Sequence, residues 1–100
     1  MKSFGLNERE LAVFQTIFRQ YPEIKEVLIF GSRAIGNWKS GSDVDVALMN
    51  NVPNEIMKQL RSEFEDSSLP YFVDLLVYPQ LKNLAIKEHI DRVGQSFYIG

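Results

Sequence analysis

The chain has 100 residues, of which 45% are hydrophobic, and its formal net charge is −2. A chain of this length is expected to form one domain, residues 1–100, that hides roughly 60–70% of its unfolded surface. The nearly neutral charge argues against a broad electrostatic grip on nucleic acid, which depends on clustered Lys and Arg, so direct nucleic-acid binding is not expected. The absence of cysteine excludes disulfides and thiolate metal sites.

The hydropathy pattern gives no sign of a membrane segment. No stretch approaches the roughly 20 apolar residues that are needed to span a bilayer. The start, Met1-Lys2-Ser3-Phe4, leads into charged residues rather than an apolar run. We therefore expect no signal peptide, no membrane partner and a cytoplasmic location.

The first half of the chain predicts one helix and one buried strand. Asn7 and Glu10 have the spacing of a capping box, and apolar residues at helical spacing follow until Pro22 ends the helix. Glu26–Phe30 is a short apolar run followed by glycine, which is typical of a buried strand entering a turn. Residues 32–42 are rich in glycine and serine and predict a loop with one helical turn at its start.

The second half alternates strands and helices. Residues 43–49 predict a second strand, and Pro53 suits the first position of the next helix. Residues 71–78 predict a third strand that Pro79 ends, and a last helix closes at Gly94. The order α-β-α-β-α-β-α predicts an α+β fold of two layers, with a small mixed sheet and helices packed against it.

Asp43 and Asp45 are the first candidate site residues. Residues two apart on a strand point to the same face, with Cα atoms about 6.6 Å apart, while Val44 and Val46 take the opposite face. Two such carboxylates repel, and they are tolerated if both reach solvent or if a divalent cation lies between them. Mg²⁺ prefers one or two carboxylates plus substrate phosphates.

Asp74 is a third acid, and it interrupts the apolar run of residues 71–77. A charge inside such a run needs a partner or a function. If this strand pairs with the second one, Asp74 lies beside Asp43 and Asp45. Three carboxylates can hold two metals about 3.5–4 Å apart, the geometry of in-line phosphoryl displacement.

Gly31 and Ser32 follow the first strand directly. A glycine lets the backbone approach a ligand closely, a helix start behind it points N–H groups at an anion, and the Ser32 hydroxyl adds a donor. Arg33 and Lys39 lie in the same loop and could contact phosphates, the arginine in a fork geometry.

Each of these features also has a simpler interpretation. The aspartate pair could be solvated, the Gly-Ser pair could be an ordinary turn, and Asp74 could be a strand-end residue that faces water. The two basic side chains of the loop would then lie in solvent. Only the meeting of all these features at one edge of the sheet favours a site for chemistry.

Gly31-Ser32, ten intervening residues and then Asp43-Val44-Asp45 resemble the signature of the polymerase-β-type nucleotidyltransferase superfamily. Residues 31–36 and 42–48 resemble its minimal, single-domain branch, and residues 73–76 resemble its third-carboxylate strand.

The resemblance implies a metal-dependent enzyme with Mg²⁺ in a two-metal site, or Mn²⁺ in its place. Its catalytic and metal-binding positions correspond to Asp43, Asp45 and Asp74. Its nucleotide-binding positions correspond to Gly31, Ser32, Arg33 and Ser42. The chain departs from the family at Ile35, where a second arginine is common, and this removes a phosphate or partner contact.

The minimal branch often pairs with a helical HEPN protein, encoded next to it, as a toxin–antitoxin module. The resemblance therefore implies adenylyl transfer from a nucleoside triphosphate, ATP in this branch, to a hydroxyl of a HEPN partner in a heteromeric complex. Larger enzymes of the superfamily carry a second domain, for which this chain has no residues to spare. Two alternatives stay open: a non-catalytic antitoxin acting by stoichiometric contact, and a transferase for a small hydroxylated molecule.

Three further features have no assigned function. His89, between Glu88 and Asp91 in the last helix, is interpreted as a surface or half-buried helix residue. Trp38 could stack on a base, touch a partner or pack over its loop. Phe97-Tyr98-Ile99 forms an apolar tail that could cover the sheet edge or dock a partner.

Overall fold

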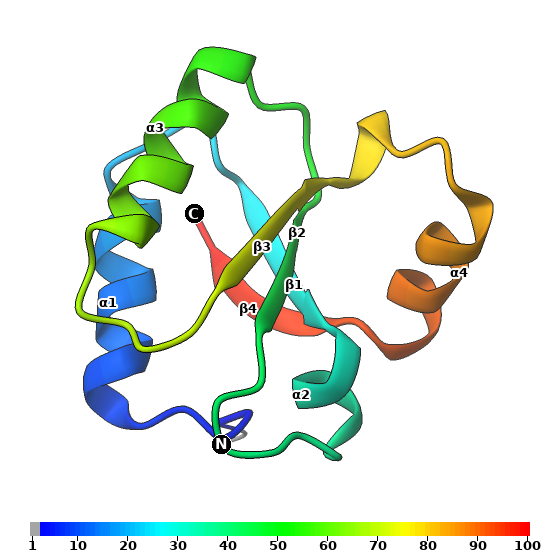
Figure 1. The fold of residues 1–100 in the computed structure, drawn as a ribbon. Coiled ribbons are helices and arrows are strands. Elements are labelled where there is room, and N and C mark those ends of the chain that lie inside the picture. Colours follow the sequence, from blue (N-terminus) through cyan, green and yellow to red (C-terminus); the bar gives the residue numbers. More distant parts are fainter. Residues whose placement is uncertain (1–2) are drawn as a thin grey trace.

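A four-stranded mixed sheet lies at the centre of the computed structural model, which describes residues 3–100 (Figure 1). The elements in chain order are α1 (Glu8–Arg19), β1 (Glu26–Phe30), α2 (Gly31–Ile35), β2 (Val44–Leu48), α3 (Asn54–Glu65), β3 (Val73–Val77), the 3-10 helix η1 (Tyr78–Gln80), α4 (Leu84–Val93) and β4 (Gln95–Ile99). The strand order is β3-β2-β1-β4. β1 is antiparallel to β2 and to β4, whereas β2 and β3 are parallel. The expected α+β fold is confirmed.

The expected starts of α1 and α3 are confirmed with small differences, whereas α4 begins at a cap that was not predicted. The side chain of Asn7 accepts from the Glu10 N–H and the Glu10 side chain accepts from the Asn7 N–H, which is a complete capping box. Pro53 precedes the first helical residue of α3 instead of occupying that position. Asn83 caps α4 through its side-chain oxygen. Met1 and Lys2, on which the expectation of no signal peptide partly depends, lie outside the described residues.

The C-terminal tail is a strand, which the order expected from the sequence did not contain. β4 pairs antiparallel with β1 along one edge of the sheet, and Tyr98 is buried. Gly94 has an extended backbone, with φ −60° and ψ 139°, so the chain leaves α4 directly into the strand. The three consecutive apolar residues of the tail show no alternation, which is why the pattern gave no strand signal. The tail therefore covers the sheet edge, one of the two roles left open for it.

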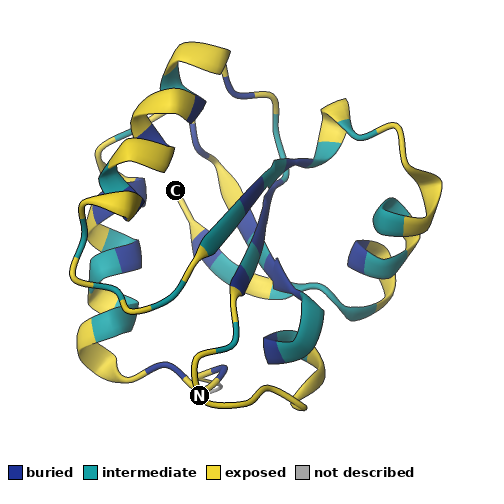
Figure 2. Ribbon diagram, in the orientation of Figure 1, coloured by how far each residue is buried: buried dark blue, intermediate teal, exposed yellow. Residues whose placement is uncertain are grey.

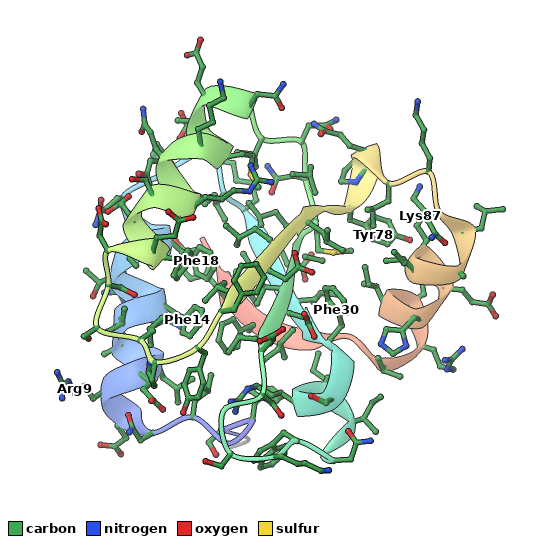
Figure 3. All side chains as sticks on the ribbon, viewed as in Figure 1. Arg9, Phe14, Phe18, Phe30, Tyr78 and Lys87 are labelled. Atoms are coloured by element: carbon green, nitrogen blue, oxygen red, sulfur yellow. The ribbon has the colours of Figure 1, made fainter. Side chains whose placement is uncertain are left out.

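Helices cover both faces of the sheet, and each face has its own core (Figures 1 and 2). The larger core joins α1 and α3 to one face, and Phe14, Phe18 and Leu60 are almost fully buried in it. The smaller core joins α4 to the other face around Phe30, Ala47 and Ile90. Figure 3 shows Phe14 and Phe18 on one side of the strands and Phe30 and Tyr78 on the other. The fold therefore has helices on both sides of the sheet, instead of the two layers expected from the sequence, because α4 packs on the face opposite to α1 and α3.

Within residues 3–100, no helix is long and apolar enough to cross a membrane.

Candidate active site

The strand register brings the expected acids together at one edge of the sheet. β2 and β3 run parallel with Asp45 opposite Asp74, and β1 runs antiparallel with Phe30 opposite Asp45. The beginnings of β2 and β3 therefore meet the end of β1, where Gly31 follows. Asp43 lies immediately before β2 and is exposed. The two ends of the Gly-Ser/Asp-x-Asp pattern thus lie side by side, as the sequence predicts.

Alternation along β2 separates the acids from the larger core. Val44 and Val46 are fully buried against α1 and α3, whereas Asp45 is half-buried on the opposite face, with Ala47 in the smaller core. Asp74 is also half-buried. The hydrophobic positions of the strand therefore decide which way the carboxylates point.

Gly31 is required at its position for two independent reasons. Its φ of +72° lies in the left-handed region that side chains other than glycine adopt at a cost. A Cβ atom added to it would overlap the carboxylate of Asp45. The backbone after β1 and the Asp45 side chain are therefore in direct contact, which leaves no room for a side chain at position 31.

Burial and repulsion raise the pKa of Asp45. Loss of solvent is the largest cause, and the negative charges of Asp74 and Asp43 follow. The positive charges of His89 and Arg33 act in the opposite direction. An unpaired carboxylate in this setting is costly when ionised, so the site favours binding of a cation.

Ser32 and the three acids have uncommitted side chains in the part of the chain that the structure describes. The hydroxyl of half-buried Ser32 makes no hydrogen bond within residues 3–100, and neither do the carboxylates of Asp43, Asp45 and Asp74. These polar groups lie together at one edge of the sheet and do not hydrogen-bond to one another, so they are available to a ligand.

Arg33 and Ser42 have a different geometry from the one expected of phosphate ligands. The guanidinium of Arg33 is only 2% exposed and donates to the main-chain carbonyls of Ser42 and Phe4. The hydroxyl of Ser42 accepts from the backbone N–H of Lys39, at 2.8 Å. Lys39 itself is exposed. The hydrogen bonds of Arg33 and Ser42 therefore hold the loop together, and the carboxylates lie just beyond its fixed end at Ser42.

His89 is a site neighbour that sequence reasoning did not find. It lies half-buried on α4, its ring meets Phe30 edge to face with centroids 6.0 Å apart, and its charge lowers the pKa of Asp45. Only the packing of α4 on β1 brings it there. A helical pattern contains no information about which strand a helix residue will face.

The donor set suits a hard divalent cation. Carboxylate oxygens are the ligands that Mg²⁺ and Mn²⁺ prefer, and a cation beside Asp45 and Asp74 would relieve their repulsion. Among residues 3–100, no three His, Asp or Glu side chains converge closely enough to hold an ion by themselves. The protein thus offers an open pair of acids, to which substrate phosphates would add the remaining ligands.

The model of the polymerase beta nucleotidyltransferase family matches residues 14–99. The chain belongs to this family. It is a nucleotidyltransferase, and enzymes of this family generally use a divalent metal. The match spans β1, β2 and β3, which carry the candidate site.

Relatives agree with this assignment. The chain is 37% identical over 81 residues to a probable protein adenylyltransferase MntA of Haemophilus influenzae, covering 76% of this chain and 71% of that one. A toxin–antitoxin crystal structure with AMP-PNP has a TM-score of 0.72 and 19% identity, over 90% of this chain and 73% of the other. A Shewanella oneidensis tri-AMPylated HEPN toxin in complex with its MNT antitoxin contains a chain with a TM-score of 0.64 and 19% identity, over 97% of this chain and 73% of that chain. At these identities the two structures establish the shared fold.

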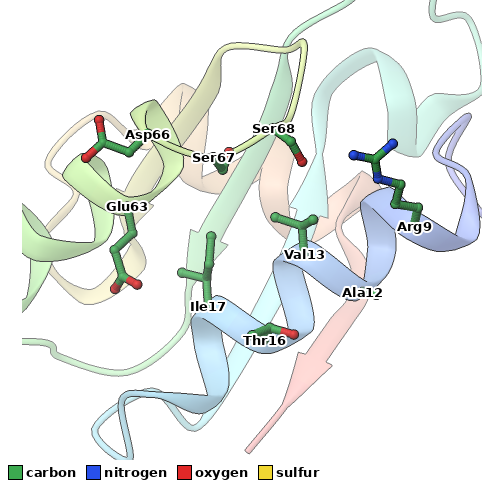
Figure 4. A pocket seen from close by; sticks show the side chains of 9 residues that line it. All are labelled: Arg9, Ala12, Val13, Thr16, Ile17, Glu63, Asp66, Ser67 and Ser68. Carbon is green, nitrogen blue, oxygen red and sulfur yellow. The ribbon is translucent and has the colours of Figure 1, made fainter.

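A groove lies between α1 and α3, the two helices that cover the opposite face of the sheet (Figure 4). Its volume is about 570 Å³. Val13 and Ile17 of α1 face Glu63 of α3 across it, and Arg9 lies at one end. The groove contains none of the acids of the candidate site, so its size does not identify it as the place of the chemistry.

Proposed function

We propose that this chain transfers the adenylyl group of ATP to a hydroxyl of a helical HEPN-type partner protein and thereby neutralises it. The observation that carries the proposal is the pairing of Asp45 with Asp74 against the backbone of Gly31. The relative named as a protein adenylyltransferase and the structural neighbours from toxin–antitoxin complexes support the choice of acceptor. We expect the complex to act in the cytoplasm.

In this proposal, Asp43, Asp45 and Asp74 would hold two Mg²⁺ ions, or Mn²⁺ in their place, together with the phosphates of the substrate, since the acids do not converge closely enough to hold an ion by themselves. The metals would supply charge neutralisation at the phosphates. Gly31 lets the backbone lie against the Asp45 carboxylate. The Ser32 hydroxyl, which makes no hydrogen bond within residues 3–100, would donate to a phosphate oxygen. Arg33 and Ser42 support this arrangement from behind the loop.

The reaction exchanges one phosphorus–oxygen bond for another. The acceptor hydroxyl gives its proton to the carboxylate of Asp74, and its oxygen attacks the α-phosphorus of ATP. The bond from that phosphorus to the β-phosphate bridging oxygen breaks, and pyrophosphate leaves. The contribution of this chain is to position the reactants and to balance charge.

The test is to incubate the protein with ATP labelled in the α-phosphate, Mg²⁺ and the product of the neighbouring gene. We expect label on that partner, and about 10³-fold slower labelling with Asp45→Asn. Asp66→Asn is the matched control, because Asp66 is an exposed acid on the groove between α1 and α3. The proposal fails if no nucleotide labels the partner and Asp43→Ala neutralises it as well as the wild type does. Protection without label would favour stoichiometric binding, and label on a small hydroxylated molecule alone would favour the other alternative.

A further inference from the structure

A buried cation connects four segments behind the candidate site. Arg33 donates from Nε and Nη2 to the Ser42 carbonyl, at 3.2 and 2.8 Å, and from Nη1 to the Phe4 carbonyl, at 2.9 Å. Its Cζ lies 4.4 Å from the centre of the Tyr71 ring. Residue 33 follows the Gly-Ser turn, residue 42 precedes the first acid, and residue 71 lies three positions before Asp74. We infer that Arg33 and Tyr71 form a clamp that positions the three carboxylates for transfer, a positioning role that rests on the proposed function.

Apart from the Trp38 indole, which packs against Gly5, the segment between these contacts has little to hold it. Every residue from 35 to 41 is exposed, and two of its glycines, Gly36 and Gly41, have φ of +97° and +83°. Within residues 3–100, its hydrogen bonds are local, from Gly36 and Asn37 back to Ser32 and between Lys39 and Ser42. A surface loop of this kind is mobile unless its ends are fixed. The two bonds from Arg33 to Ser42 fix the end that leads into Asp43.

The clamp acts on β3 as well as on β2. The Tyr71 ring stacks on the guanidinium, and its hydroxyl donates to Glu10 of α1. The next residue, Phe72, accepts from the Val44 N–H at 2.9 Å, the first bond between the two strands. Movement of the guanidinium would therefore shift the starts of both strands, on which the acids lie.

Arginine suits this position better than lysine. A planar guanidinium can give two bonds to one carbonyl, one to another and a flat face to a ring, whereas an ammonium is a compact point charge. The burial of the group also separates it from solvent, and three of its N–H groups are used by main-chain carbonyls. If Arg33 bound a phosphate of the substrate, its guanidinium would instead face the open side of the carboxylates.

The test uses the full chain with Arg33→Lys and Tyr71→Leu, each alone and combined. We expect each single change to lower kcat roughly 10²-fold, since a shift of about 1 Å in a reacting group has that effect, with little change in the KM for ATP. Amide exchange should become faster at Ser42 and Val44 but not at Ile29. The kcat of the double variant should be little lower than that of the less active single variant, because both changes break the same unit. Tyr71→Phe should keep most of the activity that Tyr71→Leu loses.

Arg19→Lys is the matched control for an arginine-to-lysine change that keeps the charge, since Arg19 is exposed on α1. The inference is overturned if Arg33→Lys raises the KM for ATP while kcat and exchange stay unchanged and Tyr71→Leu is fully active, since Arg33 would then be a phosphate ligand. It is also overturned if exchange at Ser42 and Val44 does not change. If the wild type transfers nothing, the proposed function fails, and exchange at these two amides alone still decides whether the clamp exists.

Discussion

The two faces of the sheet carry side chains of opposite character. On the face toward α1 and α3, aromatic rings pack together, and Phe14 and Phe18 lie 5.2 and 5.6 Å from Phe64 between ring centroids. On the other face, Asp45 and Asp74 lie side by side and repel. The first face gains free energy by excluding water, whereas the second gives some up to keep acids available.

The packing of the first face explains why the acids of the second stay in place without a partner. Alternating residues of β2 belong to opposite faces, so the buried valines that hold the strand also fix the direction of Asp45. The stability of the site comes from the opposite side of the same strand. Changes on the two faces should therefore separate stability from activity.

The largest expected loss of stability is for Phe18→Ala. Phe18 is fully buried and packs on Phe64 and Tyr98. Its truncation should cost about 3–5 kcal/mol, a large share of the stability of a small domain. Urea denaturation followed by circular dichroism measures it. Leu84→Ala is the control, because Leu84 is 77% exposed, and equal stability of the two variants would contradict the assignment of the core.

The largest expected loss of activity without loss of stability is for Asp45→Asn. Transfer to the partner should fall by about 10³-fold, since a group that balances charge in the transition state is lost. The thermal midpoint of the metal-free protein should stay the same or rise, because the amide is not repelled by Asp74. A lower midpoint would show that Asp45 supports the fold.

Gly31→Ala should lower both the stability and the activity of the protein. The left-handed backbone costs about 1–2 kcal/mol with a Cβ atom, and the same atom would push the Asp45 carboxylate out of position. Gly36→Ala is matched to it, because Gly36 also has a positive φ but no atom within 4 Å of an added Cβ. We expect similar losses of stability and a loss of activity only for Gly31→Ala. Equal activity in the two variants would argue against close contact at Gly31.

The raised pKa of Asp45 gives the metal-free protein a pH dependence. The folded state holds the proton more tightly than the unfolded state, so this group's contribution to stability falls as pH rises from about 3.9 through the higher folded pKa. The difference between wild type and Asp45→Asn in thermal midpoints, measured across this window without metal, isolates the effect. Mg²⁺ should reduce the difference above the window. A difference that grows in favour of the wild type with pH would contradict the sign.

The smallest effect is expected for Tyr21→Phe. The Tyr21 hydroxyl donates to Glu63 and joins the end of α1 to α3, and this bond raises the pKa of Tyr21 to about 12. The pair is partly exposed and competes with water, so the change should cost less than about 1 kcal/mol. Activity should be unchanged. A loss of transfer would show that the two faces communicate.

Local patterns were sufficient for most elements. Helical spacing and capping residues predicted α1, α3 and α4, and short apolar runs predicted β1, β2 and β3. These signals are local because the period of a helix or strand repeats within a few residues. β4 had no such signal, because its apolar residues are consecutive and its partner, β1, lies about 70 residues earlier in the chain.

The amino-acid order alone places the groups that this protein has for chemistry. The spacing of Asp43 and Asp45, and the glycine after β1, follow from two short segments. How these groups are arranged around one another depends on the tertiary fold. Asp74 joins the pair because β3 is parallel to β2, and His89 comes close because α4 packs on β1. Arg33 points inward because a guanidinium can bind main-chain carbonyls as well as phosphates. The carbonyl and the ring that surround it belong to Phe4 and Tyr71, which are distant from it in the chain, so the sequence pattern could not show which of the two roles Arg33 has.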